Sequence, residues 1–514
     1  MNYFSNPKVR IFSLSVILVA IFFIHLYKLK PESTYALDSF VKLVQTVSIQ
    51  KNSYMSEELF YSSKEIDTSM EMYPIPLYVL KVENKIISPF PFNFAYFNAV
   101  LLKFISWKFL PYICLIFAFV SYFIFYITKQ LHFLTLILAS LGTPLLFQGL
   151  EYSENSMLLL FQALGLFFFF KEKNKINLFF SAFFLTIGIF LRLETLVFVG
   201  GFYFIILILE YKMNLIKFLK EYFYSLLGVL LPLICFFSEN YLLYHHPLGA
   251  RFVINQGSLN NFVFAERLDQ VIHLLFLANW KIGFFGFTPI FLVALVWNLF
   301  RKNLKSENKY RILAYTLLFF LPFIAIIAPN DGVTNWGARY LNLGILPCLF
   351  LFDTYIIHIL QAKNKWPMRF TYFGLFFSIL ILVIGFKAQS LATKDIRQFQ
   401  DDLNQMDVSL HMAGCESIVL YSGGYYLSVP SMLPRNAEQL DSFLAKNHSK
   451  ILIPKNLIFS KIKMTPMVEQ AIKIGLFPPE EHYNSILKVL NKYNKLEKTI
   501  EGKKLTIFEF SKIK

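Results

Sequence analysis

The chain has 514 residues, of which 56% are hydrophobic and 16% are charged, and its formal net charge is +16. Soluble globular proteins are about 45–50% apolar and about 25% charged, so this composition excludes an ordinary water-soluble enzyme, a disordered chain, a collagen and a coiled coil. The distribution of the charge argues against nucleic-acid binding, because Lys and Arg occur in short runs between long apolar stretches, as in the loops of membrane proteins.

Apolar segments of roughly 16–20 residues follow one another along most of the chain, and each is long enough to be a membrane-spanning helix. The eleven predicted spans are 11–27, 109–127, 133–148, 156–170, 176–191, 193–210, 222–238, 283–300, 312–328, 340–359 and 370–388. The first is interpreted as a retained anchor, because Thr34-Tyr-Ala36 is a poor signal-peptide cleavage site. The sequence therefore predicts an α-helical polytopic membrane protein.

The charges of the short loops predict the orientation of these spans. If Lys8 and Arg10 lie in the cytoplasm, the basic loops at 171–175 and 301–311 fall on the same side, whereas the acidic loop at 151–154 faces outside. The positive-inside rule requires this asymmetry. Eleven spans then place the C-terminus on the outer face of the cytoplasmic (inner) membrane.

Three long segments are predicted to lie outside the membrane, namely residues 28–108, 239–282 and 389–514. Residues 28–108 form a first outer loop, rich in proline and aromatic residues and typical of segments that lie in the membrane interface. Residues 389–514 have more charge and shorter apolar runs, which predicts a small extracytoplasmic α/β domain after a transmembrane catalytic domain of residues 1–388. In the C-terminal domain we expect strands at 418–421, 451–454 and 505–510 and helices at 436–446, 465–474 and 480–492.

The cysteines and the missing cofactor motifs restrict the chemistry. Cys114, Cys235 and Cys348 lie in predicted spans, which leaves Cys415 alone in the C-terminal domain, so no disulfide is expected there. The sequence has no CxxC, HExxH or GxxxxGK[ST] pattern, so a structural zinc, a zinc-protease site and ATP coupling through a P-loop are not supported.

Asp38 follows the first span, where the chain leaves the bilayer. A carboxylate at this lipid–water boundary is placed to meet a lipid-linked substrate and to exchange protons with water. The alternative is a helix N-cap, because Asp followed by Ser and an apolar-periodic run is a favourable helix start. Spacing alone favours the cap.

Charged residues at two further outer positions interrupt the apolar pattern. Glu154, with Glu151, is interpreted either as a carboxylate that binds an acceptor or a metal, or as part of a solvated acidic rim. Arg192 and Glu194 stand between two apolar runs with almost no loop. Ionisable residues at the centre of a spanning helix cost about 2.5–3.5 kcal/mol and usually have partners. For this pair, function and a simple interfacial turn are equally compatible with the sequence.

Arg339 and Tyr340 begin the tenth span from its outer side, after Gly337-Ala338. Glycine and alanine permit close backbone approach, and the planar guanidinium group of arginine suits phosphate. The alternative is an arginine that merely extends to the interface. His245-His246 and Arg251, in the preceding large outer loop, are further candidates for contact with an anion, although a His pair before Pro is more typical of an ordinary loop.

In order and sidedness these features resemble the GT-C class of membrane glycosyltransferases, in particular the superfamily of protein O-mannosyltransferases and lipid A aminoarabinose transferases. The matching motifs are Asp38, Ser88-Pro-Phe-Pro91, Gly142-Thr-Pro144 with Glu154-Asn155-Ser156, Leu191-Arg192-Leu-Glu194 and Gly337-Ala-Arg339-Tyr-Leu341. The resemblance covers about residues 1–390. Two positions depart from the family pattern: Asn155 stands where His is common, and the first-loop segment lacks the Lys that often precedes its prolines.

The resemblance implies a GT-C fold and transfer of a sugar from a polyprenyl-phosphate-linked donor to a lipid, glycan or protein acceptor in the outer leaflet. Asp38 would be the general base of an inverting reaction, and Glu154 would position the acceptor or bind a divalent metal ion. The arginines would stabilise the phosphate leaving group. The substrate-binding residues implied are Arg339, Arg192, Glu194 and Tyr340. Membrane lipids are expected as further partners, and no other cofactor is implied.

Three alternatives remain open: a transporter or flippase of lipid-linked glycans, a polysaccharide polymerase or ligase, and a non-enzymatic scaffold. Transporters usually carry ionisable residues deep in their spans, whereas the third, fourth and tenth predicted spans are interpreted as apolar at their centres. A polymerase or ligase would concentrate Arg and His in one late loop, whereas this chain has its acid in the first. A glycosyltransferase is the function that the sequence favours.

Overall fold

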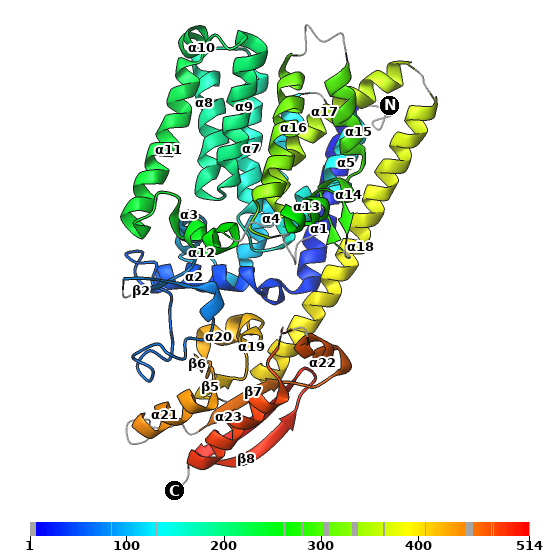
Figure 1. The fold of residues 1–514 in the computed structure, drawn as a ribbon. Helices are drawn as coiled ribbons and strands as arrows, with labels where there is room; N and C mark the ends of the chain where they lie inside the picture. Colours follow the sequence, from blue (N-terminus) through cyan, green and yellow to red (C-terminus); the bar gives the residue numbers. More distant parts are fainter. Residues whose placement is uncertain are drawn as a thin grey trace. The chain divides into compact units, whose positions relative to one another are not determined.

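The computed structural model describes residues 7–83, 85–129, 131–260, 264–278, 281–301, 308–330, 338–362, 365–406, 408–447, 456–473, 475 and 477–512 (Figure 1). The chain forms two compact units. The helical unit comprises Met1–Lys28, Phe90–Phe94 and Phe109–Ala388, and the α/β unit comprises Leu29–Pro89, Ala95–Lys108 and Gln389–Lys514. The second unit is therefore assembled from the first loop and the C-terminal segment together.

The helical unit consists of packed apolar helices joined by short turns. In chain order its elements are α1 (Pro7–Leu29), α4 (Leu110–Thr128), α5 (Phe133–Leu141), α6 (Pro144–Phe147), η5 (Gln148–Leu150), α7 (Asn155–Phe170), α8 (Lys175–Ile187), η6 (Gly188–Phe190), α9 (Glu194–Tyr211), α10 (Leu215–Glu221), α11 (Phe223–Tyr244), α12 (Gly249–Asn260), α13 (Phe264–Leu275), β3 (Leu277–Ala278), β4 (Lys281–Ile282), α14 (Phe284–Phe287), α15 (Ile290–Phe300), α16 (Asn308–Ile327), η7 (Arg339–Gly344), α17 (Ile345–Ala362) and the first part of α18 (Lys365–Asn404).

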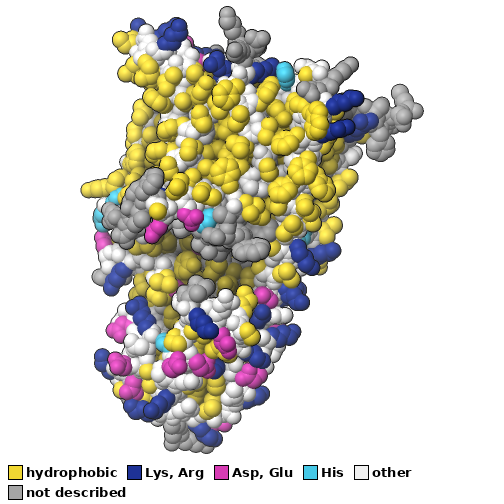
Figure 2. Space-filling view, turned by 45° about the vertical axis from the view of Figure 1, so that its right-hand side comes forward, with side chains coloured by type: hydrophobic (Ala, Val, Ile, Leu, Met, Phe, Trp, Pro, Cys, Tyr) yellow, Lys and Arg dark blue, Asp and Glu magenta, His cyan; other side chains and the backbone are white. Residues whose placement is uncertain are grey.

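Eight helices among the described residues are long and apolar enough to cross a membrane. Three further apolar helices, Asn155–Phe170, Lys175–Phe190 and Ile290–Phe300, are shorter. Each of the eleven predicted spans coincides with one of these helices, which confirms the α-helical membrane-protein class. The number of segments that cross the bilayer, and their orientation, stay predictions. Figure 2 shows a broad hydrophobic band on the surface of this unit, with Lys and Arg side chains beyond one end of it.

The third span is a broken helix, because Gly142-Thr143-Pro144 separates α5 from α6. The side chains at the break satisfy the backbone groups that it frees. The hydroxyl of Thr143 donates to the carbonyl of Ala139 at 2.7 Å and accepts from the backbone N–H of Leu145 at 3.2 Å. Thr288 donates to the carbonyl of Gly142 at 2.6 Å. A break at membrane depth is tolerated only when neighbouring groups pair the backbone in this way.

The tenth span is less apolar than the sequence analysis assumed, because it contains the fully buried Asp353. A carboxylate oxygen of Asp353 accepts from the backbone N–H of His132 and from the hydroxyl of Thr135, both at 2.8 Å. These contacts join α17 to the first turn of α5, whose N-terminal N–H groups favour an anion. Asp353 therefore holds the residue that precedes α5, while the side chain of His132 itself caps this helix.

The α/β unit contains a five-stranded sheet of order β6-β5-β7-β9-β8. Its strands are β5 (Leu410–Ala413), β6 (Ser431–Met432), β7 (Leu457–Ile462), β8 (Asn494–Glu501) and β9 (Leu505–Lys512). The β5 strand pairs in parallel with β6 and β7, whereas β9 is antiparallel to both β7 and β8. The helices are α2 (Asp38–Lys51), most of α3 (Phe92–Leu101), α19 (Glu416–Leu420), α20 (Gly424–Ser428), α21 (Ala437–Asn447), α22 (Pro466–Lys473) and α23 (Glu480–Tyr493), with the hairpin β1 (Leu80–Val82) and β2 (Lys85–Ile87).

Most of the predicted C-terminal elements are confirmed. The three predicted helices correspond to α21, α22 and α23, and the predicted strand at 505–510 lies in β9. The strand expected at 418–421 is wrong, because Glu416–Leu420 is a short buried helix, and a short apolar run does not distinguish a strand from a buried helical turn. The strand expected at 451–454 lies outside the described residues.

Backbone contacts explain why the first loop and the C-terminal segment form one unit. The N–H of Leu433 donates to the carbonyl of Met72 at 2.9 Å, and the N–H of Leu37 donates to the carbonyl of Leu420 at 3.3 Å. The hydroxyl of Tyr426 donates to the carbonyl of Phe60 at 3.2 Å. The unit therefore cannot be completed by the C-terminal segment alone.

A candidate site at a buried ion cluster

Four segments of the helical unit bring charged side chains together in a cluster, which we call the ion cluster. Glu154 and Asn155 stand at the start of α7, and Arg192 and Glu194 stand in the turn between η6 and α9. Arg251 comes from α12, and Arg339 and Tyr340 come from η7. Five of the six site residues predicted from the sequence therefore belong to one unit and one place: Glu154, Arg192, Glu194, Arg339 and Tyr340.

Arg192 is the centre of the ion cluster, and its side chain is only 2% exposed. One terminal nitrogen, Nη1, donates to Oε1 of Glu154 and to Oδ1 of Asn155, both at 3.2 Å. The other, Nη2, donates to Oε1 of Glu194 at 2.7 Å. Arg192 is thus a turn residue and at the same time a buried charge with partners. The two interpretations of the sequence, a simple turn and a functional charged pair, therefore do not exclude each other.

Two more arginines share partners with Arg192. Arg251 donates from Nη1 to Oε1 of Glu154 at 3.3 Å, so one carboxylate oxygen serves two guanidinium groups. Arg192 and Arg339 both lie over the ring of Tyr340, at 5.2 and 5.4 Å from its centroid. The Tyr340 hydroxyl donates to Asn330 at 2.9 Å. The Tyr340 ring is therefore fixed by its hydroxyl group and makes cation–π contacts with two guanidinium groups.

Arginines outnumber glutamates in the ion cluster. Its described residues include three arginines and two glutamates. Glu154 is 1% exposed and Glu194 14%, so water screens these charges poorly. Among the described residues, the buried Nε of Arg192 also has no hydrogen-bond partner. The arrangement can therefore accept an anion.

The helix dipole adds to this preference. Helix α7 has 16 residues and begins at Asn155, directly after Glu154. Its first N–H groups lack partners within the helix and carry a partial positive charge. Anions are accordingly favoured at this end of the helix.

Asp38 lies in the α/β unit, where it is the first residue of α2 and partly exposed. The N-cap prediction is wrong in position, because Leu37 precedes the helix and no side-chain capping bond is made there. Leu37 has φ +52° and ψ −124°, a strained backbone conformation for a leucine. Such strain occurs preferentially at functional sites, which is compatible with a role for Asp38 but does not assign one.

The structure also bears on metal binding. Within the described ranges, no three or more His, Cys, Asp or Glu side chains form a group that could hold a metal ion. Oε1 of Glu154 accepts from two arginines, which is the environment of a counter-ion. The metal-binding role considered for Glu154 stays a prediction without structural support.

Arg251 belongs to the ion cluster but was not among the site residues predicted from the sequence. It was considered for contact with an anion and not selected, whereas α12 brings it to Glu154. The signal available was one of two arginines, Arg251 and Arg267, in the outer loop of residues 239–282. Such a signal does not identify the partner, since Glu154 is 97 positions away along the chain.

No protein-family model and no curated protein sequence match the chain. Among solved structures it is similar to ArnT from Cupriavidus metallidurans. With ArnT bound to undecaprenyl phosphate the TM-score is 0.49 at 10% sequence identity, over 97% of this chain and 98% of that one. With ArnT in the apo state the TM-score is 0.40 at 9% identity, over the same shares of the two chains. This distant likeness concerns the course of the chain and assigns no role to any residue.

Proposed function

We propose that the protein is a membrane glycosyltransferase that transfers a sugar from a polyprenyl-phosphate-linked donor to a lipid, glycan or protein acceptor at the outer face of the membrane. The observation that carries the proposal is the buried ion cluster, in which three arginines meet two glutamates beside the N-terminus of α7. A sugar-phosphate diester has one negative charge, and arginine is well suited to bind phosphate oxygens. The undecaprenyl phosphate bound to ArnT is a lipid phosphate of the same class.

In the proposed reaction, the acceptor oxygen or nitrogen attacks the anomeric carbon of the sugar. The bond from that carbon to the phosphate oxygen breaks, and its electron pair stays on the phosphate. The carboxylate of Asp38 takes the proton of the acceptor, and the configuration inverts. Arg339 and Arg192 stabilise the charge that develops on the leaving phosphate.

The remaining residues of the ion cluster orient these groups. Glu154 holds Arg192 and Arg251 through one oxygen, and Glu194 fixes the other side of the Arg192 fork. Tyr340 supports Arg192 and Arg339 from its ring face. Preorganised cations of this kind lose little energy to rearrangement when the leaving group forms.

The proposal is tested in membranes that contain the wild-type protein or Asp38→Asn and are given a labelled polyprenyl-phosphate sugar. We expect the label to move into lipid, glycan or protein with the wild type, and Asp38→Asn to reduce transfer about 10²-fold or more. Asp401→Asn is the matched control, because Asp401 is an exposed carboxylate in the same unit. Protein levels are compared for all three forms.

Two outcomes would contradict the proposal. Transfer by Asp38→Asn at the wild-type rate would show that Asp38 is not the general base. If the label crosses the membrane while still attached to its carrier, and no transfer product forms, the protein is a transporter of the donor.

A further inference from the structure

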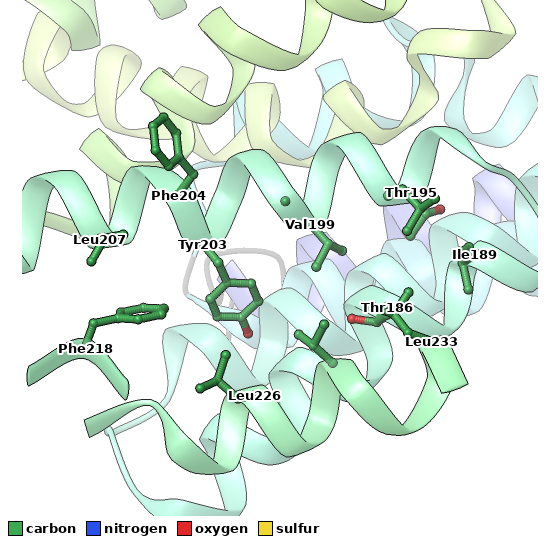
Figure 3. Close-up of a pocket in the computed structure, with 13 residues that line it drawn as sticks. Thr186, Ile189, Thr195, Val199, Tyr203, Phe204, Leu207, Phe218, Leu226 and Leu233 are labelled. Atoms are coloured by element: carbon green, nitrogen blue, oxygen red, sulfur yellow. The ribbon is translucent and has the colours of Figure 1, made fainter. Parts of the chain in front are cut away.

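A second candidate site lies in the helical unit, and its end at Thr195 adjoins Glu194 of the ion cluster. It is an apolar cavity of about 330 Å³ between α8, α9, α10 and α11 (Figure 3). Helix α9 supplies one wall, from Thr195 to Leu207, and α11 supplies another, from Leu226 to Leu233. Ligand pockets are typically about 300–1,000 Å³ and mostly apolar. The cavity is therefore large enough for part of a small amphiphile.

The cavity borders the apolar surface of the helical unit. Gly200 lines it, and a Cβ atom added to Gly200 would meet nothing within 4 Å. Phe204, which also lines it, is a large apolar side chain and 49% exposed. A lipid chain can consequently enter sideways from the membrane.

The length of the cavity corresponds to one leaflet of the membrane. Thr195 and Leu207 are twelve residues apart on α9, which is roughly 18 Å along a helix axis. Half of a bilayer's hydrocarbon core is about 15 Å thick. The space thus fits an acyl chain of ordinary length.

One end of the cavity is close to a basic surface. Tyr203 lines both this cavity and a smaller one of about 70 Å³. Three lysines and two glutamates also line the smaller cavity: Lys171, Lys173, Lys309, Glu172 and Glu210. The segments 171–175 and 210–221, together with Lys309, contain seven lysines and three glutamates. Lys173 pairs with Glu221 at 3.2 Å and lies 4.4 Å from the centroid of the Tyr222 ring. The excess of lysine at this end complements an anionic headgroup.

We propose that this cavity binds one acyl chain of an anionic glycerophospholipid, whose phosphate lies among the lysines at the 171–175 end. The charge excess selects an anionic lipid, and the one-leaflet length selects an acyl chain over a longer polyprenyl chain. The lysine end of the site lies at the opposite end of α9 from the ion cluster, and the inference does not depend on the glycosyltransferase proposal.

The experiment uses the purified full-length protein in detergent, with phosphatidylglycerol or phosphatidylcholine added. We expect native mass spectrometry to show one retained phosphatidylglycerol on the wild type. We also expect its melting temperature to rise by about 2–4 °C in excess phosphatidylglycerol and to stay constant in phosphatidylcholine.

Gly200→Trp is the decisive variant, because its side chain fills the cavity without a backbone clash. It should lose both the retained lipid and the thermal shift. Ile234→Trp is the matched control, since Ile234 is 61% exposed on α11 and does not line the cavity. It should behave as the wild type. The double variant Lys173→Gln/Lys309→Gln should bind phosphatidylglycerol less tightly, and it keeps the test decisive if Gly200→Trp does not fold.

Three results would overturn the inference. They are an unchanged phosphatidylglycerol shift in folded Gly200→Trp, an unchanged shift in the double lysine variant, and equal retention of phosphatidylcholine by the wild type. None of these readouts requires transferase activity, so they are independent of the fate of the glycosyltransferase proposal.

Discussion

Arg192 shows how much the environment of one residue determines its role. Its guanidinium group is buried and bonded to Glu154, Asn155 and Glu194. A buried charge is costly unless its partners are in place, so removing one member of such a group harms stability more than the mere loss of a contact would suggest. Arg192 is therefore expected to be structural and to bind substrate at the same time.

We predict that Arg192→Met lowers the stability of the protein by about 3–5 kcal/mol, because Glu194 loses its cation and the buried Glu154 keeps only Arg251. The measurement is the melting temperature of the purified protein in detergent. Arg251→Gln is the control, since the Arg251 side chain is 18% exposed and Glu154 keeps Arg192 as its partner. This variant should lose less stability. Equal melting temperatures for the wild type and Arg192→Met would show that the ion cluster is not a stabilising unit.

At the scale of single elements, strand β5 contains a buried titratable group. His411 is fully buried, and its Nε2 lies 2.7 Å from the hydroxyl of Ser460 on the neighbouring strand β7. Burial lowers the pKa of His411 to about 3, because the charged imidazolium cannot be solvated there. The sheet therefore holds this histidine in its neutral form.

This lowered pKa predicts that the sheet is sensitive to acid. An unfolded histidine has a pKa near 6.5, so the unfolded state binds the proton first. The contribution of His411 to stability is complete above about pH 6.5 and decreases by up to about 1.4 kcal/mol per pH unit as the pH falls toward 3. Hydrogen exchange of the β5 and β7 amides, corrected for intrinsic rates, should show this loss between pH 7 and pH 5.

His411→Gln is the matched variant for this measurement. Glutamine can still hydrogen bond to Ser460 but cannot take up a proton. The exchange protection of the β5 and β7 amides in this variant should therefore depend less on pH, even where the protection is lower at neutral pH. Identical pH profiles in the two proteins would show that His411 does not cause the acid sensitivity.

At the scale of the whole molecule, the distribution of charge predicts how the chain is oriented in the membrane. The basic loops alternate with acidic ones along the sequence, and eleven spans would place the two termini on opposite sides. A tag at the C-terminus should react with a membrane-impermeant reagent in intact cells, whereas a tag in the 171–175 loop should react only after permeabilisation. Labelling of the C-terminal tag only after permeabilisation would reverse the predicted sidedness of the ion cluster.

The sequence alone was sufficient to predict the apolar helices and to select five residues of the ion cluster. A spanning helix pairs its own backbone groups, so its position depends on local hydropathy and can be recognised from a single segment. A charge that interrupts such a pattern is equally conspicuous, which is why Arg192, Glu194, Glu154 and Arg339 could be identified without a structure.

Tertiary structure alone decided the contacts between distant segments. It brought Arg251 to Glu154, joined the first loop to the C-terminal segment, and assembled β5, β7 and β9 from strands far apart in the chain. The short run at 418–421 became a helix for the same reason, because packing outweighs local preference in a segment this short. The local sequence pattern determines which segments are apolar and which charged residues interrupt them. Only tertiary packing determines which of these charged residues contact one another.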